Sequence, residues 1–485
     1  MIGRERALAL VRAGLAASRG DYTLLSLCAR DAAHTGLREN EIHQNWTASQ
    51  AIVIARVAKD GHEGRAWTSD VTLPGLKVLV ERAYQRASSG QAPAIGAPGT
   101  LPGTAGASTR SHGATYKALS QATARQVAAG PRERADDLAT VAARARHKGF
   151  SAAGGYSASA LEIAVAGSVW RGPDGVNVDG YHAATRVGVW AEVSGEGALG
   201  GRGYAAAYAQ DMRDIDITVL AEQAMARCLA AHGRPVALDA GRYEVVLEPA
   251  AVADLLAAPA FRLAFGPVPR DCGSSGPTAV CPGQTVASPA VTLMDDPADP
   301  WGAPQPFDFE GGAKAPLVLI QNGVTHHAVF DRAAARRNGT VSTGHSTPKP
   351  GGPPAPWHLT LLPSSGAPGP ALHTRAGVGT PVSPPELLLS PGTAGLVSKV
   401  DRGLLVSRSG CFLIEGGRAV RPAAPMRLAA GPWDVLARVL EVGPVAELIL
   451  EPVEDGNDQL FLASSYGGGR FPAVLASGIP FQPLL

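Results

Sequence analysis

Two acidic side chains separated by one residue are the feature of this sequence best suited to chemistry. Asp308 and Glu310 flank Phe309, and two glycines follow them. On a β-strand, residues i and i+2 share one face, so both carboxylates would lie side by side. Paired carboxylates can transfer protons or bind a cation. The same spacing is typical of a turn whose carboxylates accept hydrogen bonds from backbone amides, and both interpretations remain open at this stage.

Two histidines lie in polar segments that can also support chemistry. His345 belongs to Ser-Thr-Gly-His-Ser at 342–346, and His43 precedes Asn45 by two residues. Histidine can act as a general base or metal ligand near neutral pH, although a solvated loop residue is the simpler interpretation. The sequence contains neither a Gly-x-Ser-x-Gly nucleophile elbow nor a P-loop, so it does not support a serine hydrolase or a P-loop nucleotidase.

Composition excludes several classes of partner. The 485 residues include 43 Lys and Arg against 42 Asp and Glu. The resulting formal charge of +1 is too small to attract a nucleic acid electrostatically. No apolar run reaches the ~20 residues that span a bilayer, and no secretory leader is recognisable. We therefore expect a cytoplasmic protein without a membrane partner. Five scattered cysteines do not form a disulfide framework, although pairing of Cys272 with Cys281 stays open.

The elements that must position these residues indicate an α+β protein with two domains. The first, residues 1–230, is expected to be an α/β domain with a mixed or antiparallel sheet. Its pattern predicts a helix at 2–18, a helix from Pro74, helices at 132–148 and 215–231, and strands at 22–29, 51–57 and within 156–210. Residues 90–115 are rich in Gly and Pro and predict a flexible loop.

The second domain, residues 231–485, is expected to be rich in β-structure. A strand at 243–247 precedes a helix at 250–262, and short strands separated by Gly and Pro turns follow. Such a pattern is typical of a sandwich or a barrel-like sheet.

Five segments in order resemble the TldD/PmbA family of metallopeptidase-type subunits. They are Leu-Arg-Glu-Asn-Glu-Ile-His-Gln-Asn at 37–45, Gly-Arg-Tyr-Glu-Val-Val-Leu-Glu-Pro at 241–249, Pro-Phe-Asp-Phe-Glu-Gly at 306–311, Leu-Ile-Gln-Asn-Gly at 319–323 and Ser-Thr-Gly-His at 342–345. Each motif is weak alone. The five nevertheless agree with the family in order and spacing, and together they extend over most of the chain. Under this resemblance Asp308, Glu310, His345 and Asn45 become candidate substrate-binding or chamber-lining residues.

The resemblance fails where the catalytic branch of the family binds metal. There a helix carries His-Glu-x-x-x-His, which holds zinc and activates water. Here the corresponding positions are Ala257, Ala258 and Arg262. Alanine cannot bind a metal, and a guanidinium has no lone pair to donate. Pro259 further disfavours a helix interior. A late cysteine ligand of the catalytic branch is also missing from the Gly-rich stretch 464–469. The resemblance thus implies no metal and no catalytic residue in this chain.

This pattern is similar to the metal-free TldE or PmbA branch. The resemblance implies a heterodimer with a TldD-like subunit that carries His-Glu-x-x-x-His and zinc. This chain would shape the chamber and bind substrate, while the partner cleaves peptide bonds.

Three alternatives stay open. A pair of this type can serve natural-product biosynthesis, processing a peptide or cleaving a C–S bond of a small thiol conjugate. The chain can instead be a stand-alone peptide-binding protein. A self-sufficient enzyme would have to use His43, His345, Asp308 or Glu310 in an unforeseen way.

Overall fold

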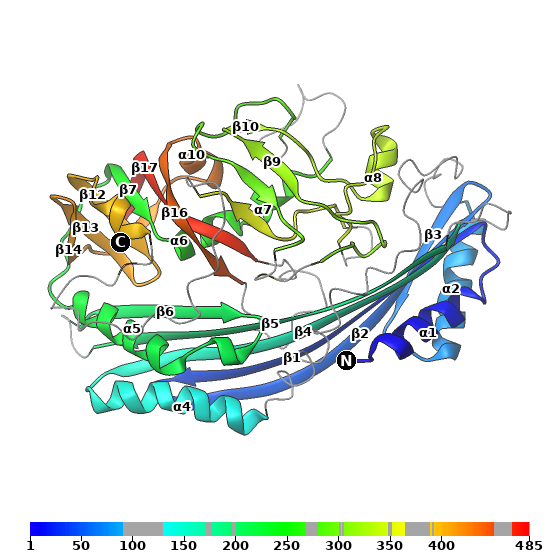
Figure 1. Cartoon of the computed structure of the whole chain (residues 1–485), viewed down its shortest axis with the longest axis horizontal. Coiled ribbons are helices and arrows are strands. Elements are labelled where there is room, and N and C mark those ends of the chain that lie inside the picture. Colours follow the sequence, from blue (N-terminus) through cyan, green and yellow to red (C-terminus); the bar gives the residue numbers. More distant parts are fainter. Residues whose placement is uncertain are drawn as a thin grey trace.

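Two β-sheets organise the chain, and the computed structural model shows them facing each other (Figure 1). The structure describes residues 1–90, 130–169, 177–195, 200–267, 280–299, 302, 305–347, 352–363, 389, 392–450 and 468–484. The Gly/Pro-rich segment 91–115, Cys272 and residues 464–467 lie outside these ranges, and with them the predictions made for each.

The first sheet is antiparallel and has six strands in the order β3-β2-β1-β4-β5-β6. Its strands are β1 Tyr22–Arg38, β2 Glu41–Lys59, β3 His62–Thr68, β4 Ser151–Val169, β5 Asn177–Ser194 and β6 Arg202–Ala209. Four of them have 17 to 19 residues, and at about 3.3 Å per residue they extend over more than 50 Å. They curve along the whole length of the molecule in Figure 1.

Four helices cover the outer face of this sheet, which is the face turned away from the second sheet (Figure 1). They are α1 Arg4–Leu15, α2 Leu73–Ser88, α4 Pro131–His147 and α5 Ile217–Ala230; the short 3-10 helix η1 Met212–Asp214 precedes α5. The Asp216 carboxylate caps α5 by accepting from two backbone amides. Gly64 lets α2 approach β3 closely, since a Cβ there would lie 1.9 Å from the Ala83 carbonyl oxygen.

The second sheet is mixed and has 11 strands. They are β7 Gly241–Leu247, β8 Leu293–Asp295, β9 Leu317–Gln321, β10 Val324–Thr325, β11 Leu359–Leu361, β12 Arg402–Ser407, β13 Gly410–Glu415, β14 Arg418–Pro422, β15 Met426–Leu428, β16 Val439–Ile449 and β17 Gly469–Pro483. β17 is central: it pairs with β7, β15 and β16 antiparallel and with β11 parallel. Short helices α6 Pro249–Leu256, α7 Pro259–Leu263, α8 Arg332–Arg337, α9 Thr393–Val397 and α10 Pro432–Leu436 connect these strands.

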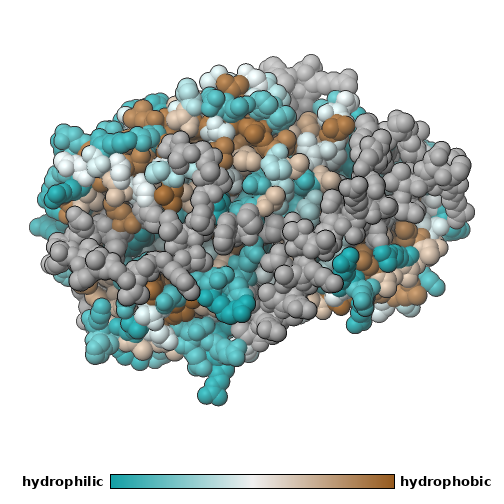
Figure 2. All heavy atoms as spheres, in the orientation of Figure 1, coloured by the Kyte–Doolittle hydropathy of each residue, from teal (hydrophilic) through white to brown (hydrophobic). Residues whose placement is uncertain are grey.

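The inner face of the first sheet packs against loops of the second half. Leu24, Cys28, Ile52, Ile54, Ile163 and Val165 form one apolar cluster with Phe307, Phe309 and Trp357. Exposed large apolar side chains of the described residues are scattered over many elements, and hydrophobic and hydrophilic residues are interspersed on the face drawn in Figure 2. The cluster therefore joins the two halves by a buried contact.

The predicted α+β class is confirmed. The first sheet is antiparallel, and the strand-rich second half forms one mixed sheet with no closed barrel among the described strands. The division at residue 230 stays a prediction. None of the helices within the described ranges is long and apolar enough to cross a bilayer.

Three element predictions are corrected. The strand predicted at 51–57 begins ten residues earlier, as β2 at Glu41. β1 continues nine residues beyond the predicted end at Ala29, because Arg30 and His34 interrupt the apolar pattern without interrupting the strand. The single helix predicted over 250–262 is instead two helices. Ala258 has extended dihedrals, φ −50° and ψ 122°, because the following Pro259 disfavours a helical residue before it.

Candidate functional site

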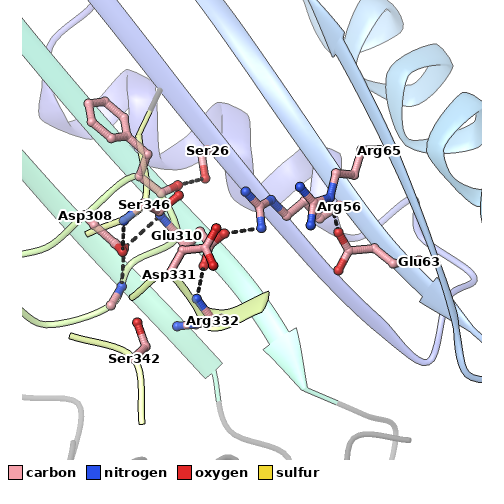
Figure 3. Close-up of polar contacts among 12 residues, drawn as sticks. Ser26, Arg56, Glu63, Arg65, Asp308, Glu310, Asp331, Arg332, Ser342 and Ser346 are labelled. Carbon is pink, nitrogen blue, oxygen red and sulfur yellow. Dashed lines mark hydrogen bonds and ion pairs between the residues drawn. The ribbon is translucent and has the colours of Figure 1, made fainter. Parts of the chain in front are cut away.

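Asp308 and Glu310 lie on a turn that connects the second half to the inner face of the first sheet (Figure 3). The backbone amide of Asp308 donates to the Gly312 carbonyl oxygen at 2.9 Å, which closes the turn. The hydroxyl of Ser26, on β1, donates to the carbonyl oxygen of Phe309 between the two acids. Both carboxylates are therefore fixed against the sheet, and each is only 1% exposed.

Asp308 serves the backbone of this turn. Its Oδ1 accepts from the amides of Glu310 at 2.9 Å and Gly312 at 2.7 Å, and its Oδ2 accepts from the amide of Ser346 at 2.8 Å. Burial, and then the nearby Glu310 carboxylate, raise the pKa of Asp308 to about 6. Of the two interpretations left open by the sequence, these contacts are those of a turn that satisfies backbone amides.

Glu310 forms the charged contact between the two halves. Its Oε1 pairs with the guanidinium of Arg56 on β2, and its Oε2 accepts from the Arg332 amide at 3.1 Å. Burial alone would raise the pKa of Glu310, but Arg56 and then Arg332 outweigh burial and lower that pKa below its usual 4.5. Glu310 is thus an ionised partner of two arginines.

More charges surround this pair, as Figure 3 shows. Arg332 donates to the Tyr22 hydroxyl at 3.0 Å, and Asp331 caps α8 through the Ala334 amide. Arg65 pairs with Glu63 on β3. We call Arg56, Asp308, Glu310, Asp331 and Arg332 the Glu310 joint, because these residues link the first sheet to the second half.

His345 is part of a separate buried network. Its Nε2 lies 2.9 Å from Asp295 Oδ2, its Nδ1 lies 2.9 Å from Thr343 Oγ1, and Lys314 Nζ lies 3.1 Å from the same Asp295 oxygen. Burial, and then Lys314, lower the pKa of His345 below 6.5. Burial would raise the pKa of Asp295, but Lys314 and His345 hold that pKa far below its usual range. Thr343 also bonds the Phe330 backbone, so this arrangement holds two loops together.

Asn45 lies on the outer face of the first sheet. Its Oδ1 accepts from Arg134 at 3.0 Å and its Nδ2 donates to the Pro131 carbonyl oxygen at 2.8 Å, which anchors the start of α4. His43, on the same strand, is exposed. The structure therefore places Asn45 apart from Asp308 and His345, whereas Asp308 contacts the His345 loop through the Ser346 amide. Their assignment to substrate binding stays a prediction.

The three positions that the family resemblance matches to His-Glu-x-x-x-His lie at the break between α6 and α7. Ala257 ends α6, Ala258 is extended, and Arg262 is buried in α7. A His-Glu-x-x-x-His motif needs one uninterrupted helix to place its side chains on one face, and this segment offers neither the donors nor the helix. No group of three or more His, Cys, Asp or Glu suited to a metal ion occurs in the described ranges. The residues here do not fit a zinc ion.

A second charged contact joins α6 to the first sheet. Asp254 on α6 pairs with Arg408 in the β12–β13 turn, and Arg408 donates to the hydroxyls of Tyr204 at 2.7 Å and Tyr208 at 3.2 Å on β6. We call these four residues the Arg408 joint. Sequence reasoning missed Arg56, Arg332 and Arg408. The only sequence signal for Arg56 is that strand alternation places its charge on the same face of β2 as the apolar residues Ile52 and Ile54.

Comparison with known proteins connects this geometry to a family. Residues 240–482 match the PmbA/TldA metallopeptidase C-terminal domain. No curated protein matches the sequence.

Solved structures share the fold over nearly the whole chain. TldE from Thermococcus kodakarensis superposes with a TM-score of 0.71 at 20% identity, covering 98% of this chain and 99% of that one. A protein from Thermotoga maritima described as a putative modulator of a DNA gyrase gives 0.68 at 16% identity, covering 95% and 96%. A putative modulator of DNA gyrase from Bacteroides thetaiotaomicron gives 0.68 at 18% identity, covering 100% of both chains. At these identities the likeness establishes the fold, and the match over half of the sequence establishes that this chain belongs to the TldD/PmbA family.

Proposed function

We propose that this chain is the metal-free subunit of a heteromeric TldD/TldE-type peptidase. It would shape the chamber and bind substrate, while a TldD-like subunit with His-Glu-x-x-x-His and zinc cleaves the peptide bond. Family membership and the full-length likeness to TldE support the proposal. We further expect the complex to be cytoplasmic.

The observation that carries the proposal is the break at the degenerate helix. Ala257 and Ala258 supply no metal ligand and no general base, and Arg262 is a buried cation where the resemblance places a histidine. The segment nevertheless keeps its packing: Phe261 contacts Phe265 and Trp433, with ring centroids 5.4 and 4.5 Å apart. A well-packed segment without metal donors is what we expect of a subunit that acts through a partner.

Reconstitution tests this proposal directly. This chain, its His-Glu-x-x-x-His-bearing relative from the same organism, and a mixture of both are assayed on unfolded polypeptide. We expect hydrolysis by the mixture and none by this chain alone. Hydrolysis by this chain alone would contradict the proposal and favour a self-sufficient enzyme.

The same experiment separates the remaining alternatives. A mixture that processes only a small thiol conjugate or a single precursor peptide would indicate a natural-product pathway. Peptide binding without any relative in the organism would indicate a stand-alone peptide-binding protein.

A further inference from the structure

The strand β3 forms one end of the first sheet and has a free side. Among the described strands it pairs only with β2, from His62 opposite Lys59 to Thr68 opposite Val53. β3 and α6 lie toward opposite ends of the molecule in Figure 1, so this edge is remote from the α6–α7 segment. A free strand edge presents backbone N–H and C=O groups to which another extended chain can hydrogen-bond.

The backbone groups of three residues of β3 point to this free side. The Arg65 carbonyl oxygen accepts from the Arg86 guanidinium of α2 at 2.5 Å. Strand alternation gives the backbone groups of Glu63 and Trp67 the same direction. The pairing of β2 agrees: the Ala58 carbonyl oxygen accepts from an amide just before β1, which leaves the odd-numbered residues of β2 to bond β3.

The side chains of the same three residues lie on the inner face of the sheet. Arg65 is opposite Arg56, and Trp67 is opposite Ile54. Figure 3 shows Arg65 and its partner Glu63 beside Arg56. Ile54 belongs to the apolar cluster that joins the two halves. Trp67 extends that cluster to the free edge, where 59% of its surface is exposed, the largest exposed fraction among the large apolar side chains of the described residues.

The outer face at this edge decides what kind of chain can pair with β3. α2 lies directly against it: a Cβ on Gly64 would lie 1.9 Å from the Ala83 carbonyl oxygen. Adjacent strands are about 4.8 Å apart, whereas packed helices need about 8–10 Å between their axes. Two copies paired through β3 would place two α2 helices over neighbouring strands, which is too close for both. The free edge therefore fits an extended segment that has no helix above it.

We propose that the free edge of β3 binds an extended, apolar segment of the substrate polypeptide, which adds to the six-stranded first sheet as a further strand. The backbone groups of Glu63, Arg65 and Trp67 hold the segment whatever its sequence, and the indole packs against one of its apolar or aromatic side chains. The Arg65 carbonyl oxygen has two lone pairs, so it can accept from the added strand as well as from Arg86.

This inference rests on the proposed function and adds a substrate-binding mode to it. An unfolded polypeptide offers both features that the edge requires, unpaired backbone groups and exposed apolar side chains. A folded protein has buried most of both. The edge would thus hold a part of the substrate that lies far from the bond to be cleaved.

Titration calorimetry with the full chain tests the main-chain contacts. The probe is acetyl-Thr-Val-Thr-Phe-Thr-Val-Thr-amide, and two analogues carry N-methyl groups on either its three apolar residues or the threonines between them. The N–H groups of alternate residues point to opposite sides of a strand, so only one analogue should lose affinity, by about tenfold or more. No binding of the probe, or the same affinity change in both analogues, would overturn the inference.

Two substitutions at one position locate the site. Arg65→Pro removes an N–H group that only an added strand would use, and proline is tolerated on an edge strand. We expect it to bind the probe at least about tenfold more weakly. Arg65→Ala removes the same side chain but keeps the N–H group, so this matched control should stay within about twofold of the parent. Urea unfolding checks that both variants are folded, and equal affinities of the two would contradict the assignment.

Trp67→Ser tests the side-chain contact without disturbing the edge. It should weaken binding of the probe about fivefold, but hardly change binding of an analogue with alanine in place of phenylalanine. Leu440→Ser removes an apolar side chain of β16 that is 56% exposed, and this matched control should bind both peptides like the parent. The same loss for both peptides in Trp67→Ser would show that the indole does not contact the aromatic residue.

Failure of this inference is distinguishable from failure of the proposed function. If the reconstituted pair hydrolyses polypeptide and this chain does not bind the probe, only the edge assignment fails. If this chain binds the probe at β3 but no relative adds hydrolysis, the subunit role fails and peptide binding stands. If Arg65→Pro loses its relative but keeps the probe, the edge binds the partner subunit and the substrate assignment is wrong.

Discussion

The Glu310 joint and the α6–α7 segment both contain residues that the family resemblance marks, but the surroundings of these residues differ. In the joint every marked acid has partners: Asp308 accepts three backbone amides, and Glu310 contacts two arginines. In the segment the marked positions are two alanines and the buried Arg262, and aromatic side chains pack around them. The difference teaches that the acids of the joint serve to connect the two halves, whereas the α6–α7 segment is held by packing and offers no set of metal donors.

The largest expected effect comes from breaking the joint. Arg56→Met would leave the buried Glu310 carboxylate with one fewer cation, which costs about 3–5 kcal/mol for a buried pair. Urea unfolding measures the loss. Arg19→Met is the matched control, because Arg19 pairs with Glu81 at the exposed surface, where solvent screens the pair and its loss should hardly change the free energy of unfolding. Equal losses in both variants would show that the joint does not couple the halves.

The pH dependence of the joint is the next largest effect. The pKa of Asp308 is raised, chiefly by burial, to about 6 from 3.8, so the folded chain binds this proton more tightly than the unfolded chain. The resulting stability is present at low pH and is lost as the pH rises through about 6. Glu310 has the opposite sign, because its pKa is lowered from 4.5 and its contribution is lost as the pH falls below that range.

Asp308→Asn tests this assignment. The variant keeps one oxygen for the Glu310 and Gly312 amides but cannot lose a proton. We expect its free energy of unfolding to change less than that of the parent between pH 5 and 7, by about 1 kcal/mol. Parallel pH profiles for both proteins would contradict the raised pKa.

A smaller effect is expected at the Arg408 joint. Arg408→Lys keeps the charge but cannot contact Asp254, Tyr204 and Tyr208 together, since the planar fork is lost. The expected cost is about 1–2 kcal/mol, with faster amide exchange confined to α6 and the β12–β13 turn. Unchanged exchange in α6 would show that Arg408 does not position this helix.

The smallest effect, on zinc binding and hydrolysis, is expected from introducing the residues of the His-Glu-x-x-x-His motif into the α6–α7 segment. The triple variant Ala257→His, Ala258→Glu, Arg262→His should gain neither stoichiometric zinc nor hydrolysis, and neither should Arg262→His alone. Ala258 is extended and Pro259 begins a second helix, so the three side chains do not share a helical face. Zinc content by elemental analysis and a peptidase assay measure the outcome, and zinc bound at one per chain would contradict this account.

Much of the fold follows from the sequence because its signals are local. Helices 132–148 and 215–231 agree with α4 and α5 within two residues, and the alternation over 156–210 predicts the antiparallel strands β4 to β6. The ends of β1 and β2 were harder to predict. Polar residues interrupt the apolar runs by which the strands were recognised: Arg30 and His34 in the extension of β1, and Gln44, Thr47 and Ser49 in that of β2.

The candidate site was less predictable because it depends on long-range pairs. Asp308 and Glu310 are visible as a motif, but Arg56 lies more than 250 positions away and only the packing of the two halves brings it to Glu310. Asp295 was likewise missed, since nothing local shows that it meets His345 and Lys314. The break at Ala258 was indicated by Pro259 alone.

The most direct test of the central claim is recovery of this chain from its own organism under native conditions, with identification and metal analysis of what co-purifies. The account predicts an equimolar relative with a His-Glu-x-x-x-His motif, and zinc that follows that relative when the subunits are separated. Recovery of this chain alone, or zinc that stays with this chain after separation, would contradict the assignment as the metal-free subunit.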